Sequence, residues 1–516
     1  MHISTLVDQC TRDLWMSLGG AMAATIKHLV VLMLENRSFD HMLGFLPGVN
    51  GLDPAWTNPL TAAGPQVQVS ADARTVHDLI PDPGHEWINV NVQIFENSDG
   101  TGAPTMKGFV EDYALVSHDK GQAPNIMKCF TPKTLPVLST LAQQYAVCDR
   151  WFASVPGPTI PNRLFTHAAH SQGSLTQDAV AAPFIIRTIF EDMDVPPNPA
   201  NYRIYTHGSS ILMVNRYLQQ NKQDHFFDFA DFETDAVKGY LPEYTFIEPA
   251  FDDDVNNGIY ANSQHPDFAV DEGKTLISTV YSCLCDSPGW NDTLLLITYD
   301  EHGGIVDHVA PPTVAPLPAN VGLPDVPPST SPQFDFRRLG VRVPAVFVSP
   351  RIPPNTVIND RDYDHCSIVA TVRKLFCGVN AKNSFNWREA QAPTFENLFT
   401  LANPRADVQL PVPVASAPLT AAQIQAATQA MASNSTITLQ AAAQDETQTI
   451  IRATALPKQP PSDPKPSDLM LAMARAMDNS LRMRGITPPS DVKNIYTAQD
   501  AADYMAAANK AAGGGS

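Results

Sequence analysis

The chain has 516 residues, of which 44% are hydrophobic and 8% aromatic, so it is long enough for one large α/β domain with insertions or for two to three smaller domains. Its formal net charge of −19 argues against nucleic acid as a partner, because binding to a phosphate backbone needs a basic face. The acidic balance also provides no general attraction to anionic membranes.

The first 24 residues contain small side chains near a candidate cleavage site, but they lack a basic n-region, a continuous apolar core and a twin arginine. We therefore interpret residues 1–24 as a short leader segment and expect a cytoplasmic protein or one secreted by a non-classical route. No stretch reaches the roughly 18–20 apolar residues of a transmembrane helix. The seven cysteines are scattered and odd in number, which favours reduced thiols over a disulfide framework.

Strand-like and helix-like segments alternate from residue 26 to about residue 400. The run Ile26–Leu34 is aliphatic and β-branched without polar alternation, as in a strand buried on both faces of a parallel sheet. Residues 48–105, rich in Pro, Gly, Asn and Asp, are predicted to form a long loop excursion, and residues 310–333 are dense in proline.

Later segments continue the alternation, which favours a parallel or mixed sheet with helices on both faces. In chain order, the predicted elements are a helix over Leu135–Tyr145, a strand start at Val147–Asp149, strands over Arg203–Thr206 and Tyr244–Ile247, a helix over Lys274–Cys285, strands over Thr293–Tyr299 and Ala345–Val348, and a helix over Ser367–Leu375.

Oxygen ligands follow two of these strands directly. Glu35 and Asn36 follow the first strand, and Asp300 and Glu301 follow Thr293–Tyr299. In open α/β sheets, ligands bind beyond the carboxyl ends of the strands. Four oxygen ligands at that edge would form a site for a hard cation such as Ca²⁺, Mg²⁺ or Mn²⁺, with Zn²⁺ as an alternative. The sequence therefore predicts a metal-dependent enzyme.

Thr159 lies in a proline-rich turn between Pro158 and Pro161. The ring of Pro158 fixes its φ and Pro161 lacks a backbone donor, so a rigid turn presents the Thr159 hydroxyl in a fixed direction. Taken alone, such a turn more often contains an incidental threonine than a functional one. The nearby Arg163 suits a phosphate oxygen by bidentate contact, or a local carboxylate.

The composition changes after Pro404, and residues 406–516 are predicted to be an Ala/Gln/Pro-rich helical region that follows a catalytic domain over residues 25–405. An extended linker, Pro457–Pro466, precedes a helix capped by Ser467. We expect these helices to pack on the domain or on another subunit, which would make a homo-oligomer. Binding of a partner protein is the alternative.

Four motifs occur in a fixed order: ENRSFDH (Glu35–His41), PGPTIPNR (Pro156–Arg163), YDEHGGIVDHV (Tyr299–Val309) and YDHCSI (Tyr363–Ile368). Together they resemble the bacterial phosphoesterase family that contains phospholipases C and AcpA-type acid phosphatases. The resemblance covers about residues 25–400. It implies an α/β, alkaline-phosphatase-like fold with a central, mostly parallel sheet flanked by helices, to which the chain adds a helical C-terminal appendage.

The resemblance also implies roles for individual residues. Thr159 falls on the nucleophile, and Arg163 and Asn162 are expected to bind substrate. A hydroxyl bound to a divalent cation loses its proton more readily, so attack on phosphorus would give a phospho-threonine that water hydrolyses. The family's metal ligands fall on Glu35, Asn36, Thr159, Asp300 and Glu301, with Asp307 as an alternative ligand and His308 as a residue that could orient a ligand carboxylate.

Histidines that bind phosphate or transfer protons are placed by the resemblance near His85, His207, His265 and His365. A loop histidine taken alone is more often solvated or structural. With the family context we expect catalytic roles for His265, His85 and His365, and His207 stays open between the two interpretations.

Threonine at position 159 favours the phospholipase branch over the acid phosphatase branch, which tends to carry serine there. We therefore expect hydrolysis of phospholipids to diacylglycerol and a phosphorylated head group. The alternatives are a broad acid phosphatase acting on small phosphoesters, and a non-catalytic binding or secreted cargo module. Loss of a ligand would be expected in the last case, and none of the predicted ligands is missing.

Overall fold

The computed structural model describes residues 25–411 except for 76–78, 178–183, 196–199, 209, 254–259, 267, 316–333 and 379–383, together with residues 474, 478, 487–490, 492, 504, 505, 507 and 508. The predicted leader, the Pro457–Pro466 linker, most of the proline-dense segment and most of the C-terminal helical region lie outside the described residues.

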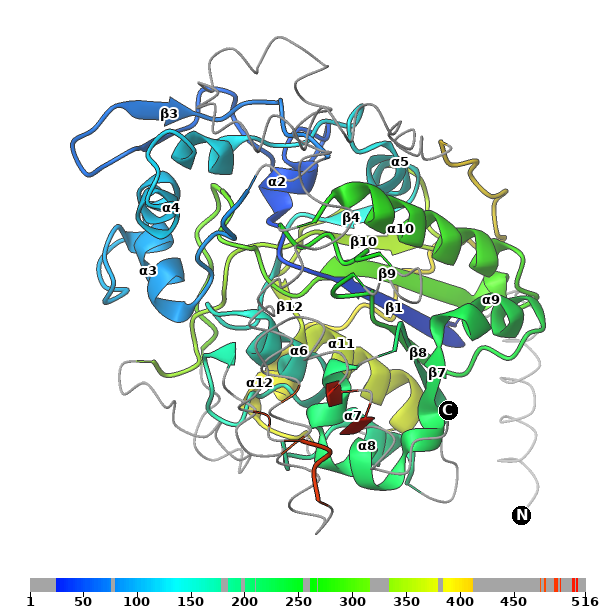
Figure 1. Cartoon of the computed structure of the whole chain (residues 1–516). Coiled ribbons are helices and arrows are strands. Elements are labelled where there is room, and N and C mark those ends of the chain that lie inside the picture. Colours follow the sequence, from blue (N-terminus) through cyan, green and yellow to red (C-terminus); the bar gives the residue numbers. More distant parts are fainter. Residues whose placement is uncertain are drawn as a thin grey trace, which may run out of the picture.

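Eight strands of the described chain form one mixed sheet (Figure 1). In spatial order, the strands are β11 (Thr356–Ile358), β4 (Ala146–Cys148), β10 (Ala345–Val348), β9 (Thr293–Tyr299), β1 (His28–Leu34), β8 (Tyr244–Ile247), β6 (Tyr202–Thr206) and β7 (Phe226–Asp228). β9, β1, β8, β6 and β7 run parallel to one another, β11 runs parallel to β4, and β10 is antiparallel to both β9 and β4.

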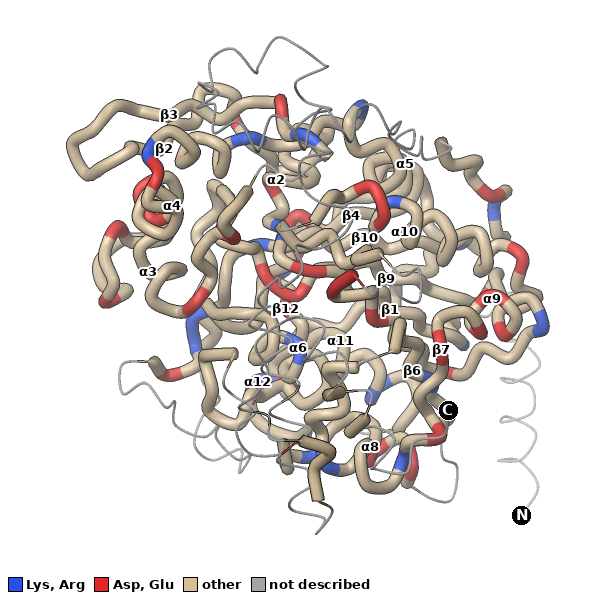
Figure 2. Tube along the Cα trace, in the orientation of Figure 1, with Lys and Arg blue, Asp and Glu red and all other residues tan. Residues whose placement is uncertain are grey.

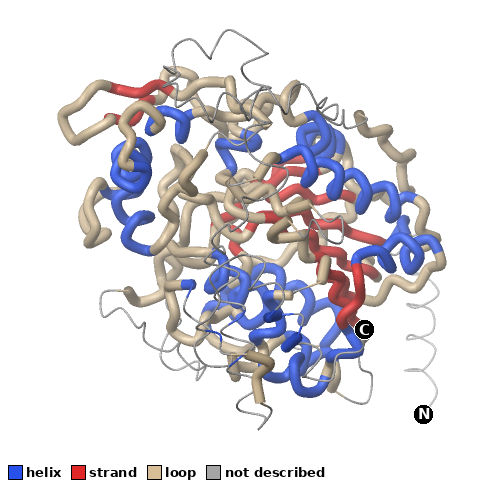
Figure 3. Tube along the Cα trace, in the orientation of Figure 1, coloured by secondary structure: helices blue, strands red, loops and turns tan. Residues whose placement is uncertain are grey.

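Helices cover both faces of this sheet (Figures 1 and 3). One face carries α5 (Pro136–Gln144), α9 (Phe229–Val237) and α10 (Val270–Cys285). The other face carries α6 (Thr159–Ala168), α7 (Ile189–Met193), α8 (Arg216–Asn221), α11 (Cys366–Val372) and α12 (Trp387–Gln391). The apolar side chains of the central strands are buried on both faces, and this confirms the predicted α/β class with a mostly parallel sheet.

The predicted loop excursion over residues 48–105 is partly wrong. It contains the hairpin β2 (Thr57–Pro59) and β3 (Gln66–Gln68) and the helix α3 (Trp87–Phe95), which packs on α4 (Phe109–Ser117). These elements bury an apolar core of their own, with Val90, Ile94 and Phe109 among its members. The small core was not predicted from the sequence, because the high content of Pro, Gly and Asn indicates turns, whereas the core depends on a few apolar side chains between those turns.

The remaining short elements are α2 (Phe39–Leu43), β5 (Trp151–Phe152), β12 (Tyr363–Asp364), the 3₁₀ turns η1 (Ala123–Met127), η3 (Ile211–Val214), η4 (Gln223–His225) and η5 (Trp290–Asp292), and the π-helical turn η7 (Arg373–Cys377). No described helix is both long and apolar enough to cross a membrane. The six described cysteines are free thiols, in agreement with the sequence prediction.

The register between β1 and β9 decides where the predicted ligands emerge. Leu34, the last residue of β1, lies opposite Tyr299, the last residue of β9. Since the two strands are parallel and adjacent, the residues that follow them leave the same edge of the sheet at the same level. Acidic residues accordingly gather near the middle of the molecule, where β1 and β9 end (Figure 2).

Candidate functional site

Glu35, Asn36, Asp300 and Glu301 are brought together at this edge, and each is at most 1% exposed. The backbone N–H of Asn36 donates to Asp300 Oδ1 over 3.1 Å, and the N–H of Glu301 donates to the same oxygen over 2.7 Å. Asn36 adopts a left-handed conformation (φ 54°), which asparagine tolerates better than most residues. The predicted ligand pairs from two strands separated by more than 250 positions in the chain therefore form one cluster.

Gly303 and Gly304 make this close approach possible. Both have positive φ angles, 64° and 66°, so both favour glycine. A Cβ atom on Gly303 would lie 2.1 Å from the carbonyl oxygen of Asn36, and one on Gly304 would lie 2.4 Å from that of Gly84. The two glycines thus let the loop after β9 contact both the first ligand pair and the segment that carries His85.

Thr159 is the first residue of α6, and its hydroxyl donates to Asn36 Oδ1 over 3.2 Å. The side chain is only 1% exposed. At a helix N-terminus the unpaired backbone N–H groups and the helix dipole favour negative charge, so this position suits an alkoxide or a phosphoryl oxygen. The proline-rich turn therefore holds the threonine hydroxyl against Asn36, one of the predicted ligands.

Asn162 holds this turn together rather than facing a substrate. Its Oδ1 accepts the N–H of Val155 over 3.0 Å, and its Nδ2 donates to the carbonyl oxygens of Gly157 and Pro158 over 2.9 and 3.1 Å. The side chain is fully buried. Because these bonds use its amide groups on the loop itself, the geometry gives no support to the predicted substrate contact.

Arg163 pairs with a local carboxylate, which is one of the two roles that the sequence left open. Its Nε donates to Asp300 Oδ2 over 2.9 Å, and its Nη2 donates to the carbonyl oxygens of Met33 and Leu34 over 3.2 and 3.1 Å. The guanidinium is 1% exposed, and in the described chain its Nη1 has no hydrogen-bond partner. Arg163 therefore fixes the orientation of Asp300 and neutralises part of the local negative charge.

Glu248 is a residue of this site that the sequence reasoning missed. It follows β8, the other neighbour of β1, and its Oε1 lies 4.0 Å from Arg163 Nη1. Ser210 donates to its other oxygen. Burial raises the pKa of Glu248 to about 7, although the charge of Arg163 opposes the shift. The signal was present, because a carboxylate also follows the predicted strand Tyr244–Ile247.

The described residues near Glu35 and Glu301 carry too little positive charge to balance these buried carboxylates. Burial, followed by repulsion from Asp300, raises the pKa of Glu35 well above its usual value. Burial likewise raises the pKa of Glu301 to about 8, against the attraction of His85. One oxygen of each, Oε1, is buried without a hydrogen-bond partner in the described chain. An all-oxygen set with unpartnered, desolvated carboxylate oxygens fits a hard divalent cation.

His85 and His265 lie next to each other, with ring centroids 6.3 Å apart. Burial disfavours the charged form of His85, but the carboxylates of Glu301 and Glu86 outweigh it, so the pKa of His85 is raised. His85 Nδ1 donates to the carbonyl oxygen of Pro83 over 2.9 Å. Burial, with the nearby charges of His85 and Arg37, lowers the pKa of His265 well below its usual value. Of the pair, His85 is the better proton donor near neutral pH.

His365 and His207 are held by the backbone around the site. His365 Nε2 donates to the carbonyl oxygen of Asp300 over 2.6 Å, while Trp151 Nε1 donates to His365 Nδ1 over 3.3 Å. His207 Nδ1 donates to the carbonyl oxygen of Glu248 over 3.2 Å. Burial lowers the pKa of both rings. In this geometry, both nitrogens of His365 are engaged, so it positions Asp300 as a neutral ring.

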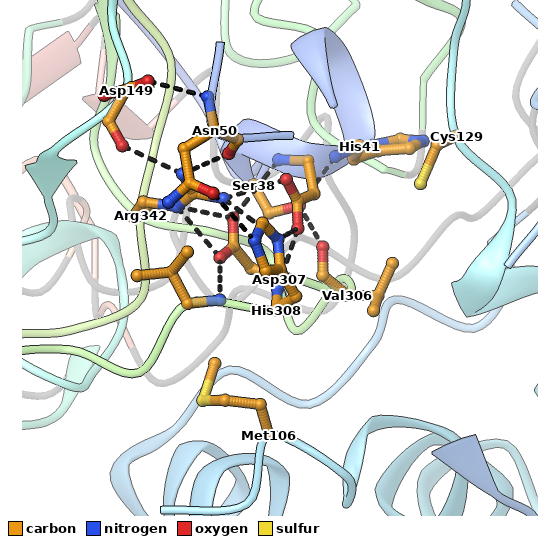
Figure 4. A network of polar contacts seen from close by, with 12 residues as sticks. Ser38, His41, Asn50, Met106, Cys129, Asp149, Val306, Asp307, His308 and Arg342 are labelled. Atoms are coloured by element: carbon orange, nitrogen blue, oxygen red, sulfur yellow. Dashed lines mark hydrogen bonds and ion pairs between the residues drawn. The ribbon is translucent and has the colours of Figure 1, made fainter. Parts of the chain in front are cut away.

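Asp40, Asp307 and His308 form a second cluster of potential metal ligands. Figure 4 shows that the guanidinium of Arg342 lies beside Asp307 and His308. Arg342 Nη2 donates to Asp40 Oδ1 over 2.9 Å and its Nε donates to Asp307 Oδ1 over 3.0 Å, while His308 Nδ1 lies 2.6 Å from Asp40 Oδ2.

A fully buried arginine already supplies the positive charge that these two carboxylates need. Arg342 Nη1 also donates to the carbonyl oxygens of Asn50 and Asp149, each over 2.9 Å. The network thus joins α2, the loop after β9 and two further loops. Asp307 and His308 therefore take part in a buried ion-pair network with Arg342, and the roles of Asp307 as an alternative ligand and of His308 as a residue that orients one stay predictions.

Comparisons with known proteins agree with this geometry. The profile of the Phosphoesterase family matches residues 26–379. The chain is 40% identical over 410 residues to Non-specific phospholipase C6 from Arabidopsis thaliana, covering 75% of both chains. It is 28% identical over 430 residues to Phospholipase C B from Mycobacterium tuberculosis, covering 73% of this chain and 78% of that one. The resemblance inferred from the four motifs is confirmed, but the family is wider than the bacterial one we expected.

Among solved structures, the chain resembles a protein in the alkaline phosphatase superfamily from Vibrio parahaemolyticus, with 13% sequence identity, coverage of 73% of both chains and a TM-score of 0.34. At this TM-score the likeness adds no weight to the fold assignment, which stands on the sheet topology and the family match.

Proposed function

This chain belongs to the Phosphoesterase family, a family of phosphoric ester hydrolases, and we propose that it is a phospholipase C. We propose further that the reaction passes through a phospho-threonine at Thr159. The substrate is a glycerophospholipid, and the products are diacylglycerol and a phosphorylated head group. The names of the relatives in Arabidopsis thaliana and Mycobacterium tuberculosis support the substrate class.

One observation carries the proposal. The hydroxyl of Thr159 lies at the N-terminus of α6 and donates to Asn36, whose backbone N–H donates to Asp300. In the described part of the chain, Glu35 and Glu301 each keep one buried carboxylate oxygen without a hydrogen-bond partner. A nucleophile at such a position can attack a phosphorus atom, and the helix N-terminus stabilises the charge that develops on the phosphoryl oxygens.

Glu35, Asn36, Asp300 and Glu301, with the Thr159 hydroxyl, would hold a divalent cation. When bound, such a cation supplies a lower pKa for the threonine hydroxyl and neutralises phosphoryl charge. The oxygen ligands favour Ca²⁺, Mg²⁺ or Mn²⁺, with Zn²⁺ as the alternative. Arg163 keeps Asp300 in the orientation that this set requires.

In the first step, Thr159 Oγ1 loses its proton to solvent and forms a bond to phosphorus, while the bond between phosphorus and the glycerol oxygen breaks. His85 gives a proton to the departing glycerol oxygen, since it is the more basic of the two adjacent histidines. In the second step, water attacks phosphorus, the P–Oγ1 bond breaks, and the head-group phosphate leaves as Thr159 recovers its proton. His265, neutral beside His85, is suited to accept the proton of that water.

The test uses soluble short-chain phosphatidylcholine, with p-nitrophenyl phosphate as the monoester comparison. We expect diacylglycerol and phosphocholine as products, and a fall in kcat of about a thousandfold or more for Thr159→Ala and for chelator-treated protein. Thr159→Ser keeps a hydroxyl and should retain part of the activity. The exposed Thr400→Ala serves as the control and should behave as wild type.

Faster turnover of the monoester than of the diester would contradict the phospholipase assignment and favour an acid phosphatase. Full activity of Thr159→Ala would contradict the assignment of Thr159 as the nucleophile.

A further inference from the structure

Gln93 lies in the helix α3 and takes no part in the proposed mechanism, although its side chain is fully buried. A side-chain amide offers two N–H donors and one acceptor oxygen. Leaving such a buried group unpaired is costly, so the partners of a buried amide indicate what it holds in place.

The two N–H bonds of the Gln93 amide are directed at two acceptors. Nε2 donates to the carbonyl oxygen of Gly84 over 2.6 Å and to Asp112 Oδ2 over 2.7 Å. The other oxygen of Asp112 accepts the side-chain amide of Asn89 over 2.9 Å. Burial raises the pKa of Asp112 to about 6, so most of this carboxylate is ionised at pH 7. The opposite orientation of the amide would place three acceptor oxygens together, and Gln93 Oε1 therefore faces away from Gly84 and Asp112.

His302, in the loop after β9, is the partner of that oxygen. The ring is 1% exposed, and its Nε2 lies 2.7 Å from Gln93 Oε1. Because the amide presents an acceptor there, Nε2 carries a proton and donates it to Gln93. The edge of the ring packs on Phe109 of α4, with the ring centroids 6.2 Å apart. Gln93 thus determines which ring nitrogen bears the proton, and it fixes the ring together with Phe109.

The other ring nitrogen of His302 faces Glu301. Nδ1 lies 3.4 Å from Glu301 Oε2, and the backbone N–H of Gly303 donates to the same oxygen over 2.8 Å. In the described part of the chain, Glu301 Oε1 is buried without a hydrogen-bond partner. The ring and the loop backbone therefore engage one oxygen of this carboxylate and leave the other available to the proposed cation.

Gln93 also holds the segment that carries His85. Gly84, whose carbonyl oxygen accepts from Gln93, directly precedes His85. A Cβ atom on Gly84 would lie 2.4 Å from Asn89 Nδ2, so this segment lies close against α3. The loop after β9 approaches the same carbonyl oxygen, 2.4 Å from a Cβ atom on Gly304. One side chain therefore connects the two segments.

We propose that Gln93 is a positioning residue for the reaction. Through His302 it orients Glu301 towards the cation, and through the carbonyl oxygen of Gly84 it holds His85 beside the site. The inference rests on the proposed function, because it takes Glu301 as a metal ligand and His85 as the proton donor. It gives the small unit of α3 and α4 a part in the chemistry.

The first experiment compares two variants of buried amides in α3. Gln93→Met removes the proposed contacts, whereas Asn91→Leu removes an amide that donates to the carbonyl oxygen of Ser98 over 3.0 Å and contacts no proposed site residue. Both should lower Tm, since each leaves buried partners unpaired.

The two variants should differ in metal affinity and in turnover. Ca²⁺, Mn²⁺ and Zn²⁺ are each titrated into the full-length, chelator-treated protein by calorimetry. For the ion that the wild type binds most tightly, we expect about tenfold weaker binding by Gln93→Met and unchanged binding by Asn91→Leu. At saturating metal, kcat for short-chain phosphatidylcholine should fall about tenfold in Gln93→Met alone. KM should change little, because the proton donor is displaced while the substrate still binds.

The second experiment needs neither turnover nor metal, so it separates a failure of this inference from a failure of the proposed function. Nitrogen NMR of the full-length protein with labelled histidine reports which ring nitrogen carries the proton, and the His302 signal is identified by its absence from His302→Asn. We expect a proton on Nε2 in the wild type. In Gln93→Met the proton should move at least in part to Nδ1, which faces Glu301.

Asp112→Asn is the milder variant if Gln93→Met does not fold. It removes one of the acceptors that fix the amide, so it should change metal affinity and the proton position in the same direction, with a loss of affinity of about threefold.

A wild-type His302 without a proton on Nε2 would overturn the proposal. Wild-type metal affinity in both Gln93→Met and Asp112→Asn would do the same, as would an equal loss of affinity in Asn91→Leu.

Discussion

Thr159 is suited to its proposed role by its neighbours more than by its own chemistry. An isolated threonine hydroxyl is a weak nucleophile at neutral pH. Here the hydroxyl lies at the N-terminus of α6 and against Asn36, and Asn162 holds the turn that presents it. The residue type was readable from the sequence, but the contact with Asn36 depends on how α6 sits on the sheet.

Arg163 should act on activity through Asp300. A lysine at this position keeps the charge, but it lacks the planar fork that reaches Asp300 and two carbonyl oxygens together. For Arg163→Lys we predict metal affinity lowered roughly 10–100-fold, with kcat partly recovered at saturating metal. Metal titration followed by calorimetry and by activity would measure both. The control is Arg150→Lys, whose partly exposed pair with Asp362 lies outside the ligand cluster; an equal loss in both variants would speak against the positioning role.

The two aspartate clusters should differ in metal content. Asp300 belongs to the proposed ligand set, whereas Asp307 is already paired with Arg342. We predict that Asp300→Asn loses the stoichiometric metal and that Asp307→Asn keeps it, as measured by elemental analysis of the purified variants after dialysis. Loss of metal from Asp307→Asn, with the fold intact by circular dichroism, would mean that the second cluster also holds an ion.

At the scale of elements, the strand ends and the loop after β9 build the site. Gly303 has a φ of 64°, and a Cβ atom added there would lie 2.1 Å from the carbonyl oxygen of Asn36. Gly378 has a similar φ of 63°, but a Cβ atom added there would have no described atom within 4 Å. The two glycines therefore separate the effect of backbone conformation from that of a close contact.

Gly378→Ala should cost about 1–2 kcal/mol of unfolding free energy, because alanine disfavours the left-handed region. Gly303→Ala should cost more, about 3 kcal/mol, because the added methyl group must also push Asn36 away. We further predict that only Gly303→Ala lowers kcat, since it displaces Asn36, a proposed metal ligand. Denaturant unfolding and steady-state kinetics on both variants provide the comparison, and equal effects in the two would argue against the close contact.

Buried strands were the most predictable elements. β8, β9 and β10 have the bounds expected from the sequence, because each is a short run of apolar residues ended by polar ones. The antiparallel direction of β10 was not predictable, since a residue pattern carries no information on strand direction. The helix expected over Ser367–Leu375 instead ends at Val372 and continues as a π-helical turn, a hydrogen-bonding detail that apolar periodicity does not encode.

The candidate site also has one part that the sequence could predict and one part that it could not. The meeting of the polar residues at the ends of β1 and β9 was predictable, because a carboxylate or amide directly follows each strand. The network of Asp40, Asp307 and Arg342 was not, because it joins side chains up to 302 positions apart whose mutual distance only the fold determines. Asp307 has the residue type of a metal ligand, and only the position of Arg342 beside it shows that its charge is already balanced.

At the scale of the whole molecule, an acidic protein concentrates buried carboxylates at one edge of its sheet. Without a cation, these carboxylates oppose folding whenever they are ionised. With a cation, the same cluster links β1, β9 and α6. Metal should therefore contribute to stability as well as to activity.

The stabilisation by metal should grow with pH. In the metal-free protein, burial raises the pKa of Glu301 to about 8 from its usual 4.5. A group whose pKa is raised in the folded state favours folding at low pH, and this contribution is lost as pH rises from 4.5 through 8. Metal binds the deprotonated carboxylates and removes that loss. We predict that the difference in Tm between metal-loaded and chelator-treated protein increases from pH 6 to pH 9. A difference that is constant or falls with pH would contradict a carboxylate-bound cation.

The most direct test of the central claim is to trap the covalent intermediate. The metal-loaded protein is mixed with short-chain phosphatidylcholine, quenched in acid within the first turnovers, digested and analysed by mass spectrometry. Because the head group stays on phosphorus when the glycerol oxygen leaves, we predict phosphocholine on the peptide that contains Thr159, and no such group on the same peptide of Thr159→Ala. Modification at another residue while product forms steadily would contradict Thr159 as the nucleophile. The same conclusion would follow if product formed but no residue was modified at any time point, including single-turnover quenches of slowed variants such as Thr159→Ser.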